Sequence, residues 1–157
     1  CCPIVFRYAD VLLTWAEAEN ELNGPSADVY SKINMVRKRV GMPDVDQAKY
    51  NSKEKLRELI RRERGSEFAG EGLRRADILR WTTPSGKMVA ETVLNGTLTR
   101  ITGTVDTTVV DPTRRAIVSG TSVVEERTFH PYNRYLPIPQ NNISDNPKLV
   151  QNPGYAK

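Results

Sequence analysis

The sequence has little of the chemistry that metal and redox sites use. Its 157 residues include one histidine, His130, and two cysteines, which are the adjacent pair Cys1 and Cys2. Adjacent cysteines rarely bridge each other, so the sequence predicts no disulfide framework and no Cys/His metal cluster. A mature bacterial lipoprotein begins with a lipid-bearing cysteine, which is one interpretation of Cys1. The other is that Cys1 is an internal residue at the start of a fragment.

Long apolar runs are also missing. No run approaches the ~18 residues that a membrane-spanning helix needs, and no signal peptide opens the chain. The net charge of +4 is spread evenly, because residues 1–82 carry 15 Lys/Arg against 13 Asp/Glu and residues 83–157 carry 8 against 6. Each part therefore contributes +2, and no basic patch indicates nucleic acid as a partner.

The 38% of apolar residues can support a core, and the first 24 residues place many of them in a helix. The stretch "RYADVLLTWAEAENELNG" predicts a helix that ends at Gly24, with Pro25 behind it. At about 100° per residue, one broad face is apolar and the other is polar. The apolar face comprises Tyr8, Val11, Leu12, Trp15, Ala16 and Leu22, and the polar face Asp10, Thr14, Glu17 and Glu21.

A second helix is predicted from its cap, Ser26, through Val40, with Gly41 as its stop. Tyr8 to Gly41 spans 34 residues, which is the tetratricopeptide length. One such hairpin, here residues 6–41, cannot bury all its own faces, so we expect it to stack on further helices. The predicted apolar stripe of the second helix is Val29, Tyr30, Ile33, Val36 and Val40.

A helical segment over residues 52–95 follows. Ser52 caps a helix from Lys53 to about Ala69, glycines then interrupt it, and a shorter helix is expected from Leu73 to Trp81. The stretch "PSGKMVAETVLNG" has the pattern of one more short helix.

The composition changes to Thr, Val and Gly at residue 96. The stretches "TGTVDTTVV", "RRAIVSG" and "TSVVEERTF" predict strands around a turn at Asp111-Pro112, and the Pro- and Asn-rich tail from His130 predicts irregular structure. The expected fold is mainly α. It comprises a tetratricopeptide-like αα-hairpin and further helices, followed by a small β-containing, loop-rich closing segment over 96–157.

The segment "LRELIRRERGSEFAGEGLRRADILRW" carries the densest set of candidate functional groups. On a helical wheel Glu63 and Glu67 share a face with Leu56, so both point inward and need cations or donors. We expect arginines to supply them, with Glu71 reaching Arg74 or Arg75. The predicted structural ion-pair network is Glu63, Glu67, Glu71, Arg74, Asp77 and Arg80.

Catalytic and metal-binding interpretations of these carboxylates are weaker. A di-iron site needs Glu-x-x-His on paired helices, whereas the only histidine lies in the tail. A glycosidase needs a raised-pKa acid, and neighbouring arginines lower a carboxyl pKa. We therefore predict no catalytic residue, no metal and no cofactor. Aromatic rings stack on sugars, which makes Trp81, Tyr132 and Tyr135 the candidate ligand-binding residues, although an aromatic side chain is more often part of the core.

Several stretches together resemble the SusD/RagB family of glycan-binding outer-membrane lipoproteins of Bacteroidetes. They occur in the family's order and cover most of residues 6–82 and 135–155: "FRYADVLLTWAEAENELNG", "INMVRKRVGM", "LIRRERGSEFAGEGLRRADILRW", "YLPIPQNNI" and "NPKLVQNPGY". The resemblance implies the C-terminal part of such a protein. It also carries over, as scaffold, the pattern of Glu63, Glu67, Glu71, Arg74, Asp77 and Arg80, with Gly65 and Gly70 in place of bulkier residues.

The resemblance implies a binding protein and not an enzyme. Family members capture oligosaccharides, or sometimes peptides, for a SusC-like TonB-dependent transporter at the cell surface, where the full-length protein is lipid-anchored. Their sugar contacts lie on variable loops, so none carries over residue by residue. Two alternatives remain open at this stage: a helical-repeat module that binds a protein partner, and a carboxylate glycosidase. The sequence does not name the ligand.

Overall fold

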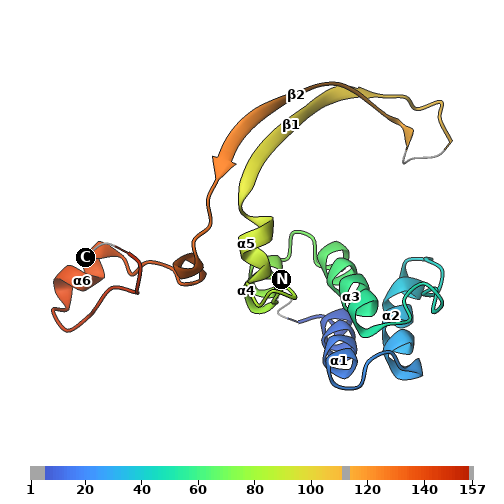
Figure 1. The fold of residues 1–157 in the computed structure, drawn as a ribbon, viewed down its shortest axis with the longest axis horizontal. Coiled ribbons are helices and arrows are strands. Elements are labelled where there is room, and N and C mark those ends of the chain that lie inside the picture. Colours follow the sequence, from blue (N-terminus) through green and yellow to red (C-terminus); the bar gives the residue numbers. More distant parts are fainter. Residues whose placement is uncertain (1–5, 111–113, 156–157) are drawn as a thin grey trace, which may run out of the picture. The chain divides into compact units, whose positions relative to one another are not determined.

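The structure is a computed structural model that describes residues 6–110 and 114–155. The chain divides into two compact units, residues 1–74 and 75–157. The first unit contains the helices α1 (Tyr8–Asn23), α2 (Ala27–Arg39) and α3 (Lys53–Glu67) (Figure 1). Cys1 and its two interpretations lie outside the described residues.

The predicted αα-hairpin is confirmed. Gly24 ends α1 with a φ of 78°, a left-handed conformation that favours glycine, and donates its N–H to the Asn20 carbonyl. The Ser26 hydroxyl caps α2 by accepting the N–H of Val29, and Ser52 caps α3 in the same way. The third helix ends at Glu67, two residues before its predicted end.

One apolar core joins the three helices of the first unit. It is formed by side chains from α1, α2 and α3 and by Val45 from the loop that follows α2. The buried polar group Asn20 donates its amide to the Lys53 carbonyl at 3.0 Å, which ties α1 to the start of α3. The largest fully buried apolar side chains are Leu13, Val29, Ile33, Leu56 and Ile60.

The predicted apolar face of α1 is partly wrong. Leu12 and Ala16 are buried as expected, but four other members of that face are exposed: Tyr8, Val11, Trp15 and Leu22. The predicted polar face packs instead against α3. There Asp10 accepts a hydrogen bond from Arg64 at 2.9 Å, and Glu21 pairs with Arg57. A wheel drawn on hydropathy misses this arrangement because arginines on α3 compensate the acids on α1.

The second unit begins with two short helices, α4 (Arg74–Arg80, which begins at the unit boundary) and α5 (Val89–Val93). A small second core forms around Ile78, Ala90 and Phe129. The Asn95 side chain links this core to the chain beyond the strands, since its carbonyl accepts the N–H of Phe129 and its amide contacts the Phe129 carbonyl at 3.3 Å.

An antiparallel β-hairpin makes the β part of the second unit. It consists of β1 (Gly96–Val105) and β2 (Ala116–Arg127), which run side by side as one curved ribbon (Figure 1). The three predicted strands are therefore two, because "RRAIVSG" and "TSVVEERTF" form one strand. The strand predicted at "TGTVDTTVV" is misplaced, since β1 begins six residues before this stretch and ends at Val105. The turn predicted at Asp111-Pro112 lies outside the described residues. At Gly103 a Cβ would stand 2.2 Å from the Ile117 carbonyl oxygen, so the close strand approach needs glycine there.

The tail is irregular as predicted, with a 3₁₀ turn, η2 (Pro131–Arg134), and a short helix, α6 (Gln140–Asp145). Side-chain amides replace regular backbone pairing here. The Gln151 amide both accepts the N–H of Ile138 at 2.8 Å and donates to its carbonyl at 2.9 Å, and Asn152 donates to the Leu136 carbonyl. The stretches "YLPIPQNNI" and "NPKLVQNPGY" are thereby held against each other. The fold is mainly α with a small β-containing closing part, as the sequence predicts.

Candidate functional site

The densest polar contacts of the first unit surround the C-terminal end of α3. Glu63 and Glu67 lie one helical turn apart on the face that Leu56, Leu59 and Ile60 bury, so their carboxylates extend from the core side of the helix. The Glu67 side chain is 10% exposed, as the inward helical phase predicts. A carboxylate in this position requires hydrogen-bond donors.

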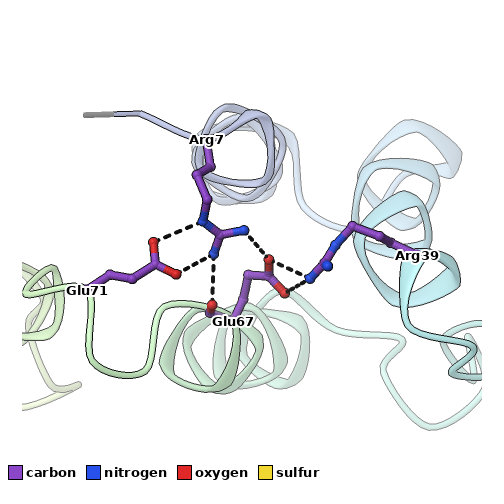
Figure 2. Close-up of polar contacts among 4 residues, drawn as sticks. All are labelled: Arg7, Arg39, Glu67 and Glu71. Atoms are coloured by element: carbon purple, nitrogen blue, oxygen red, sulfur yellow. Dashed lines mark hydrogen bonds and ion pairs between the residues drawn. The ribbon is translucent and has the colours of Figure 1, made fainter. Parts of the chain in front are cut away.

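Arg7, the residue before α1, supplies most of these donors. Its guanidinium donates to the Glu67 carboxylate at 2.7 Å and to the Glu67 carbonyl at 2.9 Å. It also donates to both carboxylate oxygens of Glu71, at 2.6 and 2.9 Å (Figure 2). Arg39, at the end of α2, donates to both oxygens of Glu67 at 2.8 Å. Glu71 was predicted to reach Arg74 or Arg75, but its observed bidentate partner is Arg7.

Glu63 also takes its partner from outside the segment. It forms an ion pair with Arg37 of α2, whose Nε donates to the Pro43 carbonyl at 2.7 Å and so ties the loop after α2 to the same cation. None of the three partner arginines, Arg7, Arg37 and Arg39, was predicted from the sequence. "RKR" at the end of α2 is a visible cationic cluster, but no spacing rule connects it with a carboxylate 24 to 30 residues later.

The remaining members of the predicted network lie further along the chain. Arg80 donates to the buried Asp77 carboxylate at 2.8 and 3.1 Å, so these two members of the network pair with each other. The Arg74 guanidinium lies against α3, where a Cβ at position 65 would be 3.5 Å from its Nη1. Gly65 thus leaves ordinary contact space beside Arg74. A structural role for these six residues remains a prediction.

The electrostatics of this cluster oppose acid catalysis. Burial raises the pKa of Glu67, but the hydrogen bonds and charges of Arg7 and Arg39 together lower it by more. The net effect is a pKa below the usual value. A hydrogen bond from Arg57 likewise lowers the pKa of Glu21. Carboxyls of this kind are ionised near neutral pH and do not donate protons. Among the described residues, no group of three or more His, Cys, Asp or Glu side chains is arranged to hold a metal ion.

The three candidate aromatics have different surroundings. Trp81 is 4% exposed, which leaves no open face for a sugar. Tyr132 stacks on His130 with ring centroids 5.2 Å apart, and a Cβ at position 154 would lie 2.4 Å from its ring, so Gly154 sits against it. Only Tyr135 of the three has a largely accessible ring, at 46% exposure. Arg134 lies over that ring at 5.2 Å.

A hollow of about 470 Å³ lies between the loop after α2 and α3. We call it the loop hollow. It combines apolar surface from Met42 and Pro43 with hydrogen-bonding groups such as Asp44, Lys49 and Arg62. Tyr50, which also lines it, is fixed because its carbonyl accepts the Tyr30 hydroxyl at 2.7 Å and its own hydroxyl accepts from Arg62. Such mixed lining suits a polyhydroxylated ligand.

Comparison with known proteins assigns the family. The sequence model of the SusD family matches residues 2–155, and the chain belongs to that family. It is similar to SusD-like protein P25 of Formosa agariphila, with 48% identity over 79 residues, which are 50% of this chain and 15% of the relative. SusD-like protein P38 of the same organism is 37% identical over 83 residues, covering 49% of this chain and 16% of P38.

Solved structures agree on the fold. A SusD-like protein from Bacteroides fragilis superimposes with a TM-score of 0.71 and 32% identity, covering 97% of this chain and 26% of that one. A SusD homologue from Bacteroides thetaiotaomicron gives a TM-score of 0.57 and 29% identity, with 96% and 26% covered. The chain therefore spans about a quarter of these structures and a smaller share of the curated relatives. None of the helices over the described ranges has the length and apolar character to span a membrane.

Proposed function

We propose that this chain is part of a nutrient-binding subunit that captures oligosaccharides for an outer-membrane uptake system. The observation that carries the proposal is the match of the SusD family over residues 2–155. The loop hollow supports it, because its mixed apolar and polar lining suits a sugar, and because ion pairs and hydrogen bonds from α2 and α3 hold its walls in place. Tyr135 is the aromatic candidate that retains an accessible ring.

The proposed subunit works by binding without chemistry. Arginine-paired carboxylates hold the helices together, and the lowered pKa of Glu67 gives no proton donor for glycoside cleavage. The intact protein acts at the cell surface, lipid-anchored in the outer membrane, and hands its ligand to a SusC-like TonB-dependent transporter. Neither a cofactor nor nucleic acid takes part.

The first test combines binding with product analysis on the intact protein. A panel of oligosaccharides is titrated by calorimetry, and each mixture is then incubated and analysed for shorter products. We expect saturable binding of at least one oligosaccharide, with every substrate recovered intact.

Two results would contradict the proposal. One is the absence of binding to any oligosaccharide while the protein is folded by circular dichroism. The other is reproducible cleavage that disappears in Glu63→Gln or Glu71→Gln, since these substitutions remove a carboxylate but keep the side-chain shape. The transporter partnership is tested separately, by co-purification from outer membranes with the tagged intact protein.

A further inference from the structure

Arginines dominate a second hollow, of about 470 Å³, near the C-terminal end of α3. Four of its nine lining residues are arginines, and no Asp or Glu is among these nine residues, all of which lie in the described part of the chain. The others are small or aromatic, with Phe68 as the only ring. We call this the arginine hollow. Its arginines are Arg61, Arg62, Arg64 and Arg74.

Two of the four arginines are fixed by neighbours that do not line the hollow. The Arg64 side chain is 5% exposed and donates to Asp10 at 2.9 Å and to Thr14 at 3.0 Å. Arg61 pairs with Glu58 at 3.6 Å. The contacts with Asp10 and Thr14 hold the Arg64 guanidinium beside the hollow in a set position, so little of its side-chain entropy is lost when an anion arrives.

The other two arginines are exposed. Arg62 donates to the Tyr50 hydroxyl at 2.8 Å, which leaves further N–H groups of its guanidinium for a ligand. Arg74 approaches α3 over Gly65, where its Nη1 lies 3.5 Å from the position of a Cβ. This distance is an ordinary van der Waals contact, so the Arg74 guanidinium lies directly against α3 at the hollow.

Arg61 is also held at an electrostatic cost. Burial lowers the pKa of Arg61, and the nearby charge of Arg57 lowers it further, although Glu58 acts in the opposite direction. An oxyanion in the hollow would reduce this cost while accepting paired N–H groups, the geometry in which guanidinium binds carboxylate and sulfate groups.

We propose that the arginine hollow binds the acidic group, a carboxylate or a sulfate, of an acidic oligosaccharide. The proposal rests on the proposed function, because it names the class of sugar that the subunit accepts. Its volume falls within the ~300–1,000 Å³ of small-ligand sites, enough for a charged sugar unit. Specificity for the acid follows from the four arginines, because their positive charges attract an anionic group and a neutral sugar carries none.

The test uses the intact protein and three oligosaccharides of equal length: one neutral, one bearing uronate carboxylates and one bearing sulfates. Arg62→Gln and Arg74→Gln each remove one exposed cation from the hollow. Arg100→Gln is the matched control, because Arg100 is exposed on β1 and its loss changes the net charge equally. Calorimetry is run at about 0.05 M and about 0.5 M salt, and circular dichroism checks folding.

We expect at least one acidic oligosaccharide to bind more tightly than the neutral one. The affinity for this acidic oligosaccharide should be lower at high salt than at low salt. Each hollow variant should weaken that binding about tenfold, which is the scale of one charged hydrogen bond, while Arg100→Gln leaves it unchanged. The binding of the neutral sugar should be the same in Arg74→Gln and Arg100→Gln as in the unmodified protein, because neither residue lines the loop hollow. Whichever oligosaccharide binds, the one with uronate carboxylates or the one with sulfates, identifies the acidic group.

Three results would overturn the inference while the capture function stands: neutral and acidic sugars binding equally, acidic binding unaffected in both hollow variants, or an equal loss in Arg100→Gln. The last would indicate attraction by net charge alone. Binding of an acidic peptide in place of every acidic sugar would also overturn it. Failure to bind any oligosaccharide, neutral or acidic, would instead contradict the proposed function itself.

Discussion

Glu67 joins the ends of three helices through two arginines. Arg7 comes directly before α1 and Arg39 ends α2, and both donate to the one carboxylate near the end of α3. Each arginine is partly exposed, whereas the carboxylate between them is nearly buried. The removal of Glu67 therefore leaves two cations that water reaches only in part.

Glu67→Ala should destabilise the protein by about 1–3 kcal/mol. Breaking a fully buried pair costs about 3–5 kcal/mol, and the exposure of the two arginines reduces this figure. Glu58→Ala is the matched control on the same helix, because its side chain is 72% exposed and its pair with Arg61 is long, so we expect a change within about 0.5 kcal/mol. Urea denaturation of the intact protein measures both. Equal midpoints for the two variants would contradict a structural role for Glu67.

Acid should weaken the ion pairs that join α3 to the rest of the first unit. The pKa values of Glu67 and Glu21 lie below their usual values in the folded protein. A depressed folded pKa adds stability above the unfolded value of about 4.3, and this stability is lost as the pH falls through the folded value.

We therefore expect the unfolding free energy to change little between pH 7 and about pH 5 and to fall as the pH drops below about 4.3. Denaturation curves across this range test the prediction. In Glu67→Gln, which cannot titrate at this position, the acid-induced fall should be smaller. A profile that keeps the wild-type steepness in this variant would show that other carboxyls account for the acid sensitivity.

Among the elements, α1 has an apolar face that its own unit does not cover. Tyr8, Val11, Trp15 and Leu22 are exposed, and Lys32 lies over the Trp15 ring at 3.9 Å without hiding it. In helical-repeat folds a neighbouring helical pair covers such a face. Left uncovered, an apolar patch promotes association.

We expect residues 1–157, expressed alone, to self-associate at micromolar concentration. The double variant Val11→Glu, Leu22→Glu should shift the size-exclusion profile toward the monomer, because it places charge on this face. Val40→Glu, an exposed apolar residue at the end of α2, is the control and should leave the profile unchanged. A sharp monomer peak with native-like near-UV circular dichroism in the unmodified chain would show that α1 needs no cover.

Elements with strong local signals are the ones that the sequence predicts. Ser26 and Ser52 mark helix starts, and Gly24 marks a stop, because each acts on backbone groups within a few residues. The hairpin strands were predicted less well. The first begins six residues before the predicted stretch, and the second was divided in two. The Ser and Gly residues inside β2 look like a break, yet antiparallel pairing with β1 carries the strand through them.

At the scale of the whole molecule, long-range pairing sets the limit of prediction. The inward phase of Glu67 follows from helix geometry, whereas its partners Arg7 and Arg39 lie 60 and 28 residues away. The same holds for the contact of Asp10 with Arg64, which turned a supposed solvent face into an interface. Choosing among 23 Lys and Arg residues requires the tertiary fold, and a helical wheel does not contain it.

The position of Arg7 also has a mechanical consequence. It stands ahead of the first turn of α1 and is fastened to Glu67 and Glu71, at and beyond the far end of α3. A force applied to the chain before Arg7 therefore passes into α3 through the guanidinium before it can unwind α1 from its first residue. In a single-molecule pulling experiment from that side, this clamp would act as the first breaking point, and α1 would unravel only after it yields.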